Sequence, residues 1–133
     1  MDLRLAPSVQ PGCLGNVEFT VFPSTSVSAS QTSPDYANMN GRGVVVVLDV
    51  TTAGSATATV EIDGKDVASG KYYALLTSAA VGSNGTTVYT VYPGLTAAAN
   101  VTASNVLPAT WRVKVTYGGS GAGTYSVGAS VIP

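Results

Sequence analysis

The sequence predicts an all-β protein, an antiparallel β-sandwich of about seven strands that is immunoglobulin-like or a related barrel. Three observations carry this prediction: short segments in which apolar and polar residues alternate, turn residues between them, and the absence of a long segment with helical periodicity. Short strands joined by turns, without helices, are typical of sandwiches and barrels. A chain of 133 residues is long enough for one domain with its own core.

The first third of the chain differs in composition from the rest. Residues 1–41 contain four of the seven prolines and the polar tract "PSTSVSASQTSPDYANMNG". Because proline removes backbone donors and short polar residues bury little area, we expect an extended N-terminal arm over 1–41 that lies along its own domain or a neighbouring subunit. Alternation over Asn16–Phe22 predicts one short strand in this arm. Residues 42–133 are expected to form the β-sandwich domain.

The first strands of the predicted sandwich domain lie between residues 44 and 81. Val44–Thr52 is β-branched and continuously apolar in its first half, which is typical of a strand buried on both faces. Thr57–Ile62 alternates and ends at Asp63-Gly64, a common hairpin turn. Tyr72–Val81 is a third apolar run. These segments predict three consecutive strands.

A fourth strand is predicted over Thr86–Tyr92, between two turn signals. Asn84-Gly85 precedes it and Pro93-Gly94 ends it. The segment that follows, "LTAAANVTASNVLPA", contains Asn, Thr and Ser residues that favour an irregular connection over a helical turn.

Two C-terminal segments have the clearest period of two. Trp111–Tyr117 places apolar residues on one face, and Thr124–Ile132 does the same after the glycine-rich "GGSGAG", which predicts a hairpin between them. Within the last segment, "GTYSVGA" resembles the penultimate strand of an immunoglobulin-like domain, which carries a tyrosine corner. Because no further strand follows it, either the topology differs or a strand from the N-terminal arm or another subunit fills that edge.

Composition argues against several classes of function. Charged residues make up 10% of the chain, against about 25% in an average protein, and the net charge is −1. The six basic residues are scattered, so we expect no nucleic-acid binding. The longest aliphatic run, Val44–Leu48, is too short for a membrane-spanning helix, so no membrane partner is expected. The start "MDLRLAPSVQ" has no secretory signal, which predicts synthesis in a cytoplasm without export.

The stretch "GKDVASGKYY" resembles a phosphate-binding loop only superficially. Such a loop needs four residues between its first glycine and the Gly-Lys pair, followed by Ser or Thr. Here five residues separate Gly64 from Gly70, and Tyr72 follows Lys71. The glycines are therefore interpreted as turn residues, and no cofactor is expected.

We predict that the protein is not an enzyme, with no catalytic, cofactor-binding or metal-binding residues. The sequence has no histidine, which removes the commonest general base and the commonest transition-metal ligand. The only acidic cluster is Glu61, Asp63 and Asp66. Oxygen ligands at this spacing are compatible with calcium, but a solvated hairpin tip is the favoured interpretation because Lys65 lies within the cluster.

Two single residues have structural interpretations. Asp49, within a predicted buried strand, is expected to pair with Arg112, with Lys114 or with a backbone donor. Cys13 is the only cysteine and lacks a neighbouring histidine base, so it is interpreted as a small, partly buried apolar residue.

The seven tyrosines and Trp111 have two possible roles. Most lie at inward positions of alternating strands, which favours core packing. The alternative is a platform for carbohydrate, which would require outward-facing Tyr72, Tyr73, Tyr89 or Tyr92 to cluster in a groove.

The second half of the chain also resembles a known group of proteins. The segments "ASGKYYALLTSAAV", "VYPGLTAAANV" and "LPATWRVKVTYGG", within Ala68–Gly119, resemble small virion proteins of tailed bacteriophages, some of which are described as head decoration, or cement, proteins. These segments are strand and turn sequences without catalytic residues. The resemblance implies a structural virion protein.

A decoration protein of this kind would bind between major capsid subunits and stabilise the head. Its partners would be the major capsid protein, copies of itself as a trimer or other oligomer, or both. It would be made in the host bacterial cytoplasm and reside on the capsid surface, and the arm over 1–41 would make much of the contact. The alternatives are a tail or minor tail component, and a host-surface or carbohydrate-binding β-sandwich module.

Overall fold

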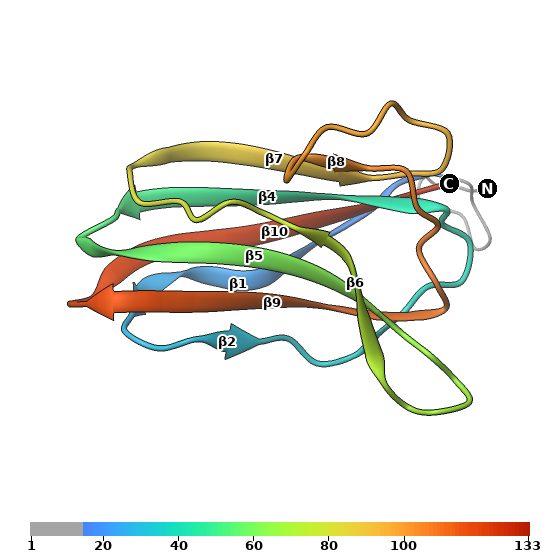
Figure 1. The fold of residues 1–133 in the computed structure, drawn as a ribbon, viewed down its shortest axis with the longest axis horizontal. Helices are drawn as coiled ribbons and strands as arrows, with labels where there is room; N and C mark the ends of the chain where they lie inside the picture. Colours follow the sequence, from blue (N-terminus) through green and yellow to red (C-terminus); the bar gives the residue numbers. More distant parts are fainter. Residues whose placement is uncertain (1–14) are drawn as a thin grey trace, which may run out of the picture.

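The structure is a computed structural model that describes residues 15–133. Two β-sheets pack face to face, and no helix occurs in the described residues (Figure 1). Sheet A has the strand order β1-β10-β4-β7-β8, and sheet B has the order β2-β9-β5-β6, with β3 also paired to β9. The predicted antiparallel β-sandwich is confirmed; only the short pairing of β8 with β7 is parallel.

Most strands coincide with segments that the sequence predicts. In chain order the strands are β1 (Val17–Val27), β2 (Gln31–Thr32), β3 (Tyr36–Ala37), β4 (Gly43–Thr52), β5 (Ser55–Lys65), β6 (Tyr72–Thr77), β7 (Gly85–Val91), β8 (Thr102–Ala103), β9 (Thr110–Ser120) and β10 (Gly123–Ile132).

The strand order is that of a jelly roll. If β2 and β3 are counted as one strand and β8 as an appendage of β7, eight strands remain, in two sheets of four. The chain crosses between the sheets at every connection except the hairpin from β5 to β6. The first and last long strands, β1 and β10, are antiparallel neighbours. This arrangement defines the double-sheet jelly roll, in which β10 is a central strand of its sheet.

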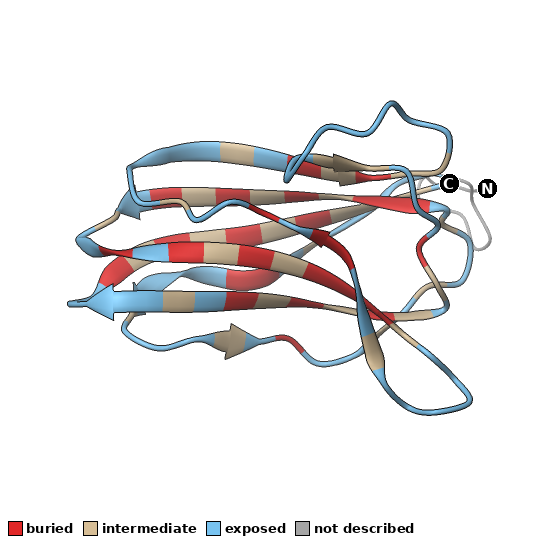
Figure 2. Cartoon of the chain, in the orientation of Figure 1, coloured by how far each residue is buried: buried red, intermediate tan, exposed pale blue. Residues whose placement is uncertain are grey.

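The core is formed by every second residue of the long strands. Figure 2 shows buried and partly exposed positions alternating along β4, β5, β9 and β10. Side chains of a strand point alternately to its two faces, so one face of each sheet is buried against the other sheet. The largest fully buried side chains are Trp111, Tyr89, Tyr125, Leu48, Ile62, Val44, Val46, Val60, Val91, Val113, Val115 and Val127.

The described part of the predicted arm contributes strands to both sheets. The short strand predicted over Asn16–Phe22 is present and extends to Val27, and the pairings of β2 and β3 with β9 are additional. The sequence prediction ended at Phe22, where the alternation of apolar and polar residues stops and Pro23 follows. Pro23 is tolerated because it lies on an edge strand, between the register shifts that separate Phe22 from Thr25. Residues 1–14 of the arm, including Cys13, lie outside the described residues.

β1, from the N-terminal segment, occupies the edge of β10 at which the final strand of an immunoglobulin-like domain was missing. β1 pairs with β10 from Val17 to Val27, and β4 occupies the other side of β10. Tyr125 of β10 is buried, and its hydroxyl donates to Oε1 of Gln31 at 2.7 Å rather than to an upstream backbone group. The topology also differs, so both explanations offered for the missing final strand apply.

Two predicted turns are wrong. β5 runs through Asp63-Gly64 to Lys65, and the hairpin to β6 turns at residues 66–71, where the amide of Gly70 donates to the carbonyl of Asp66. Gly64 is required because its backbone lies against Tyr73 and Pro108, leaving no room for a Cβ. The "GGSGAG" segment does not close a hairpin, because β9 and β10 belong to different sheets. Glycine marks a change of direction at residues 118–123, whereas Gly64 marks a close approach of other side chains to a continuous strand.

Phe22→Ala tests whether β1 belongs to the folded core. Phe22 is 8% exposed, so we expect the substitution to lower the free energy of unfolding by about 3–5 kcal/mol through lost burial and a cavity. The matched control is Val67→Ala, at a side chain that is 90% exposed, which should change stability by less than about 0.5 kcal/mol. Urea unfolding of the three proteins measures both values, and equal stabilities would contradict the placement of β1.

Candidate interaction surface

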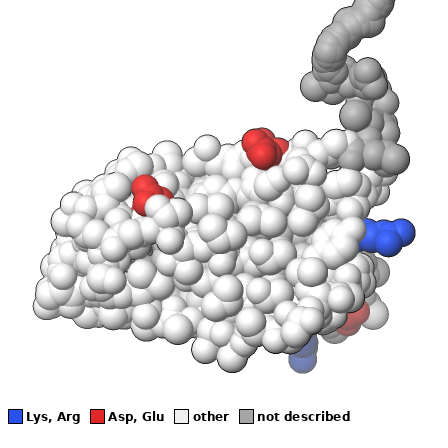
Figure 3. All heavy atoms as spheres, turned by 90° about the horizontal axis from the view of Figure 1, so that it is seen from above, with Lys and Arg blue, Asp and Glu red and all other residues white. Residues whose placement is uncertain are grey.

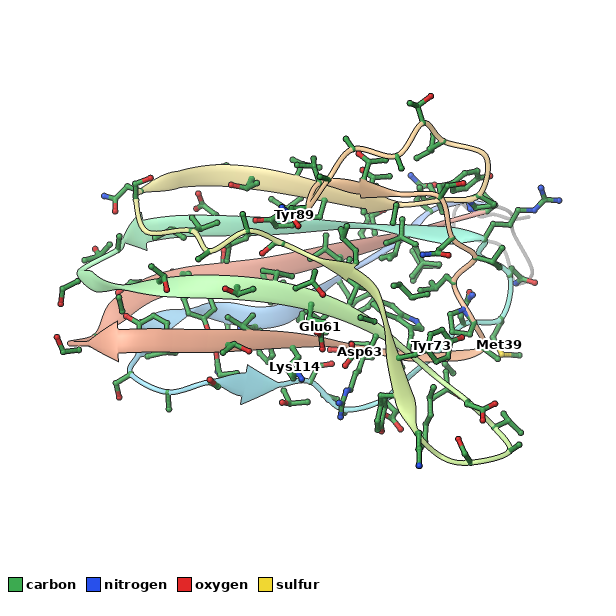
Figure 4. All side chains as sticks on the ribbon, viewed as in Figure 1. Met39, Glu61, Asp63, Tyr73, Tyr89 and Lys114 are labelled. Carbon is green, nitrogen blue, oxygen red and sulfur yellow. The ribbon has the colours of Figure 1, made fainter. Side chains whose placement is uncertain are left out.

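Charged side chains gather on the outer face of sheet B. Glu61 and Asp63 of β5 lie directly opposite Lys114 and Arg112 of β9 in the sheet register. Lys114 Nζ lies 3.1 Å from Glu61 Oε1, and Arg112 Nε lies 3.0 Å from Asp63 Oδ2. Figure 4 shows Glu61, Asp63 and Lys114 between β5 and β9. Opposite charges directly across a sheet stabilise the pairing of the two strands.

Further contacts extend from these two ion pairs to Asp35, Lys65 and Tyr72. Asp35 accepts from Tyr72 Oη at 2.7 Å and from Lys65 Nζ at 3.1 Å. The guanidinium of Arg112 lies 3.5 Å from the centre of the Tyr72 ring, which is a cation–π contact. The three acids and three bases of this network balance each other, so it presents little net charge to a partner. We call this set of side chains the ion-pair network.

The predicted solvated hairpin tip at Glu61, Asp63 and Asp66 is wrong for Asp63. The sequence places Glu61, Asp63 and Asp66 on a solvated turn, whereas the structure buries Asp63 within β5 and places only Asp66 in the turn. Burial, together with the neighbouring Glu61 carboxylate, raises the pKa of Asp63 to about 6, although Arg112 opposes this shift. Hydrogen bonds and the charge of Lys114 hold the pKa of Glu61 below its usual value despite partial burial.

Asp66 has a local structural role. Its carboxylate accepts from the backbone amide of Ser69 at 3.1 Å and from the hydroxyl of Ser69 at 2.7 Å, and these bonds lower the pKa of Asp66. The turn therefore satisfies its own polar groups, and Gly70 adopts a positive φ of 73° within it. Within residues 15–133, no group of three or more acidic, histidine or cysteine residues is placed to hold a metal ion.

Asp49 lies on the outer face of sheet A, far from its predicted basic partners. Its neighbours in β4 alternate, so Leu48 and Val50 point into the core and Asp49 points outward. Asp49 Oδ1 accepts from the hydroxyl of Thr86 at 2.7 Å. The predicted pairing with Arg112 or Lys114 is wrong because both bases belong to sheet B.

The four tyrosines of the carbohydrate alternative do not form one groove. Tyr89 is buried in the core, and Tyr72 is engaged by Asp35. Tyr92 donates to the carbonyl of Pro133 at 2.7 Å. Tyr73 is half-exposed on β6, well separated from Tyr89 in Figure 4. Core packing and local bonding account for three of the four rings.

An apolar cleft lies at one end of the sandwich, beside Gly15, where the described residues begin. The cleft has a volume of about 300 Å³, and three aromatic rings line it, Phe19, Tyr36 and Trp111, with centroids 4.8 to 6.0 Å apart. Two asparagines, Asn38 and Asn40, also line the cleft, and Asn38 is already bonded to backbone groups of Gly41 and residues 107 and 108. The cleft offers apolar contact and brings together no set of titratable side chains.

We call the surface built by Tyr72–Trp111 the uncharged side. Its strand β6 lies beside the ion-pair network, where Tyr72 contacts Asp35 and Arg112, and Thr77 contacts Glu61. This segment contains no Asp, Glu, Lys or Arg, and it builds β6, β7, β8 and their connections. Seen from the β7 side, the molecular surface carries charged residues only near its margins (Figure 3). Of the eight large apolar side chains exposed in residues 15–133, five belong to the uncharged side. They are Tyr73, Val88, Leu95, Val101 and Val106.

The uncharged side was readable from the sequence but was not predicted. The low charge was treated as a property of the whole chain, whereas Tyr72–Trp111 is the longest of its segments without a charged residue. An exposed surface that combines apolar side chains with no charge is the composition expected of an interaction site. The uncharged side is therefore the candidate functional site.

Comparisons with known proteins do not identify a family for this chain. No protein-family model and no curated protein matches this sequence. One solved structure that is similar in fold is described as the structure of infectious bursal disease virus Gx strain, with a TM-score of 0.41 and 10% sequence identity. The similarity covers 96% of this chain and 36% of that chain. Residues 15–133 contain no helix with the length and apolarity needed to span a membrane.

The ion-pair network predicts a decrease in stability between pH 5 and pH 7. Because folding raises the pKa of Asp63 from 3.8 to about 6, its protonated form stabilises the fold at low pH, and this contribution is lost as the pH rises through 6. Urea unfolding should show a loss of about 1 kcal/mol over this interval. Glu61, whose pKa is lowered, responds only at lower pH.

Two variants attribute this decrease to one carboxyl group. Asp63→Asn cannot ionise, so the decrease should vanish while Arg112 keeps an oxygen acceptor. Asp66→Asn is the control, because its carboxylate is exposed and its pKa is lowered, so the decrease should persist. A decrease that survives Asp63→Asn would rule out this assignment.

Proposed function

We propose that this protein is a structural, non-enzymatic virion protein of a tailed bacteriophage, a head decoration protein that binds between major capsid subunits and stabilises the head. Its activity would be an added binding free energy rather than a reaction. The proposal rests on the resemblance of Ala68–Gly119 to small phage virion proteins and on the surface that this segment builds.

One observation carries the proposal. The segment that resembles virion proteins and the uncharged side are nearly the same part of the chain, 68–119 and 72–111. This segment supplies five of the eight large apolar side chains exposed in residues 15–133, and exposed apolar area gathered on one part of a surface is typical of interaction sites. We therefore propose the uncharged side as the surface that meets the capsid.

The distribution of charge agrees with a binding role of this kind. The ion-pair network neutralises itself on the outer face of sheet B, so that face would remain hydrated and attract no charged partner strongly. The uncharged side can be covered without removing any charged group from water, which would cost several kcal/mol per ion. A protein present at high concentration on a shell needs a large contact area more than fast electrostatic steering.

The jelly roll is compatible with the proposal without establishing it. This fold occurs in viral capsid domains, but also in lectins and cupins, so fold alone does not assign function. The strands of residues 17–37 are part of the sandwich, so contact is proposed for the uncharged side rather than for the whole arm over 1–41. Deletion of 1–41 would remove β1 and test stability instead of attachment.

The copy number in virions separates a head protein from a tail protein. In purified particles of the phage that encodes this chain, quantitative mass spectrometry should find a copy number of the same order as that of the major capsid protein. A small fraction of that number, similar to known tail subunits in the same sample, would support the tail alternative. Absence from the particle would refute a virion role.

Leu95→Glu tests the contact surface. Leu95 is exposed in the connection between β7 and β8, which projects beyond the sandwich (Figure 1), so a carboxylate there would be desolvated on attachment. We expect binding to undecorated particles to weaken by at least about tenfold, which corresponds to about 1.4 kcal/mol. Val67→Glu, at an exposed valine in the turn beside the ion-pair network, is the matched control and should bind normally. Co-sedimentation with particles measures both, and equal binding would move the contact elsewhere.

A further inference from the structure

The outer edge of β7 is open over residues 85–89. β4 pairs with β7 along its whole length on one side, whereas β8 pairs with it on the other side only at Thr90 and Val91. β8 ends abruptly on its N-terminal side because Asn100 adopts a positive φ of 64° and turns the chain away. We call residues 85–89 the open edge.

The direction in which the backbone amides and carbonyls of the open edge point follows from the hydrogen bonds between β7 and β8. The amides of Thr90 and Tyr92 donate outward, to the carbonyls of Val101 and Ala103. Because backbone direction alternates along a strand, the amide and carbonyl groups of Thr86 and Val88 also point outward. No strand within residues 15–133 pairs with them.

The other described sheet edges are protected. β1 carries Pro23, and two register shifts in its pairing with β10 make the strand irregular; β2 and β3 are short strands separated by Pro34. On β6, the carbonyl of Leu75 accepts from Asn105 Nδ2 at 3.1 Å. Prolines, bulges, short strands and covering groups are the features that prevent edge-to-edge association. The open edge has none of them and carries no charge of its own.

We infer that the open edge pairs antiparallel with the same edge of a second copy of this chain, about a twofold axis at Thr87. Thr86 would then lie opposite Val88 of the second copy, and the two residues would exchange both backbone hydrogen bonds. The twofold axis generates the same pair a second time, between Val88 and Thr86 of the second copy. The outward-pointing amide and carbonyl groups of both residues in both copies would then all be hydrogen-bonded. The two A sheets would form one continuous sheet.

The length of the open edge fits this partner. In the proposed register, residue 89 lies opposite residue 85 of the second copy. β7 begins at Gly85, and β8 occupies the edge from Thr90 onward, so the pairing ends where β8 begins. Gly85 has open space around its Cα, which leaves room for Val101 of the second copy. A longer incoming strand would collide with β8.

The charge distribution favours an identical partner over a basic or acidic one. The uncharged side places no like charges against each other when it meets itself. The nearest acid, Asp49, lies one strand inside the edge and is held by Thr86. Across the proposed pair the two Asp49 residues are three strand spacings, about 14 Å, apart, beyond the range of strong repulsion at physiological salt. This inference concerns the protein alone in solution and does not depend on the proposed virion role.

Cysteine substitutions test the register. In a Cys13→Ser background, Thr87→Cys would face itself across the axis at a Cα separation of about 4.5 Å, which a disulfide can bridge. Thr86→Cys is the matched control, because the two copies of residue 86 would be about 8 Å apart, beyond disulfide reach. Under mild oxidation we expect the Thr87→Cys protein to form covalent dimers and the Thr86→Cys protein to remain uncrosslinked. Equal crosslinking of the two would overturn the proposed register.

Light scattering during size-exclusion chromatography tests the association itself. We expect the wild-type chain to have the mass of a dimer, and Val88→Glu to raise the dissociation constant at least about tenfold. Val67→Glu should remain dimeric, and thermal melting shows whether each variant is folded. A wild-type monomer at every concentration, or a folded Val88→Glu protein that still dimerises normally, would overturn the inference. If such a monomer nevertheless binds particles, only this inference fails and the proposed function stands.

Discussion

The pairing of β1 with β10 is the contact on which the rest of the structure depends. It places the first and last long strands side by side and makes β10 a central strand, so the sequence between them must wind into two sheets. It also fixes the two margins of sheet A. β1 takes one margin with its proline and register shifts, and β7 is left at the other with only the short β8 beside it. The surface available to a partner is therefore a consequence of topology as much as of composition.

The same topology separates the charged and uncharged surfaces. β5 and β9 are adjacent in sheet B, so their outward residues meet as the pairs Glu61–Lys114 and Asp63–Arg112. The strands derived from Tyr72–Trp111 lie at the far margins of both sheets and bring no charge to them. Few charges would give a poorly soluble surface if they were spread evenly. Concentrating most of them on one face keeps that face hydrated and leaves the margin built by β7 and β8 without charge.

The strands could be predicted from the sequence where one face alone is buried. Alternation in Trp111–Tyr117 and Thr124–Ile132 located β9 and β10 to within a few residues, because side-chain period and burial coincide there. Topology could not be predicted in the same way. Glycine at residues 118–123 marks a change of direction equally well for a hairpin and for a crossing between sheets, and only long-range packing of the two faces decides between them. The predicted strand over Asn16–Phe22 likewise ended too early, because alternation stops before Pro23 and local sequence does not show that an edge strand continues through it.

The errors at the candidate site have a related cause. Asp63 belongs to a short acidic run that looks solvated, but β5 continues through it, and it is buried and paired with Arg112 of the neighbouring strand. The uncharged side, by contrast, is visible in the sequence as 72–111, a long segment without any charged residue. Such a segment contains no catalytic or metal-binding side chain that would draw attention to it. For the proposed binding role, the informative positions are those where a charge would weaken the contact. The open edge of β7 is where this applies most strongly, since a single carboxylate at Val88 would oppose both the strand pairing and the apolar contact around it.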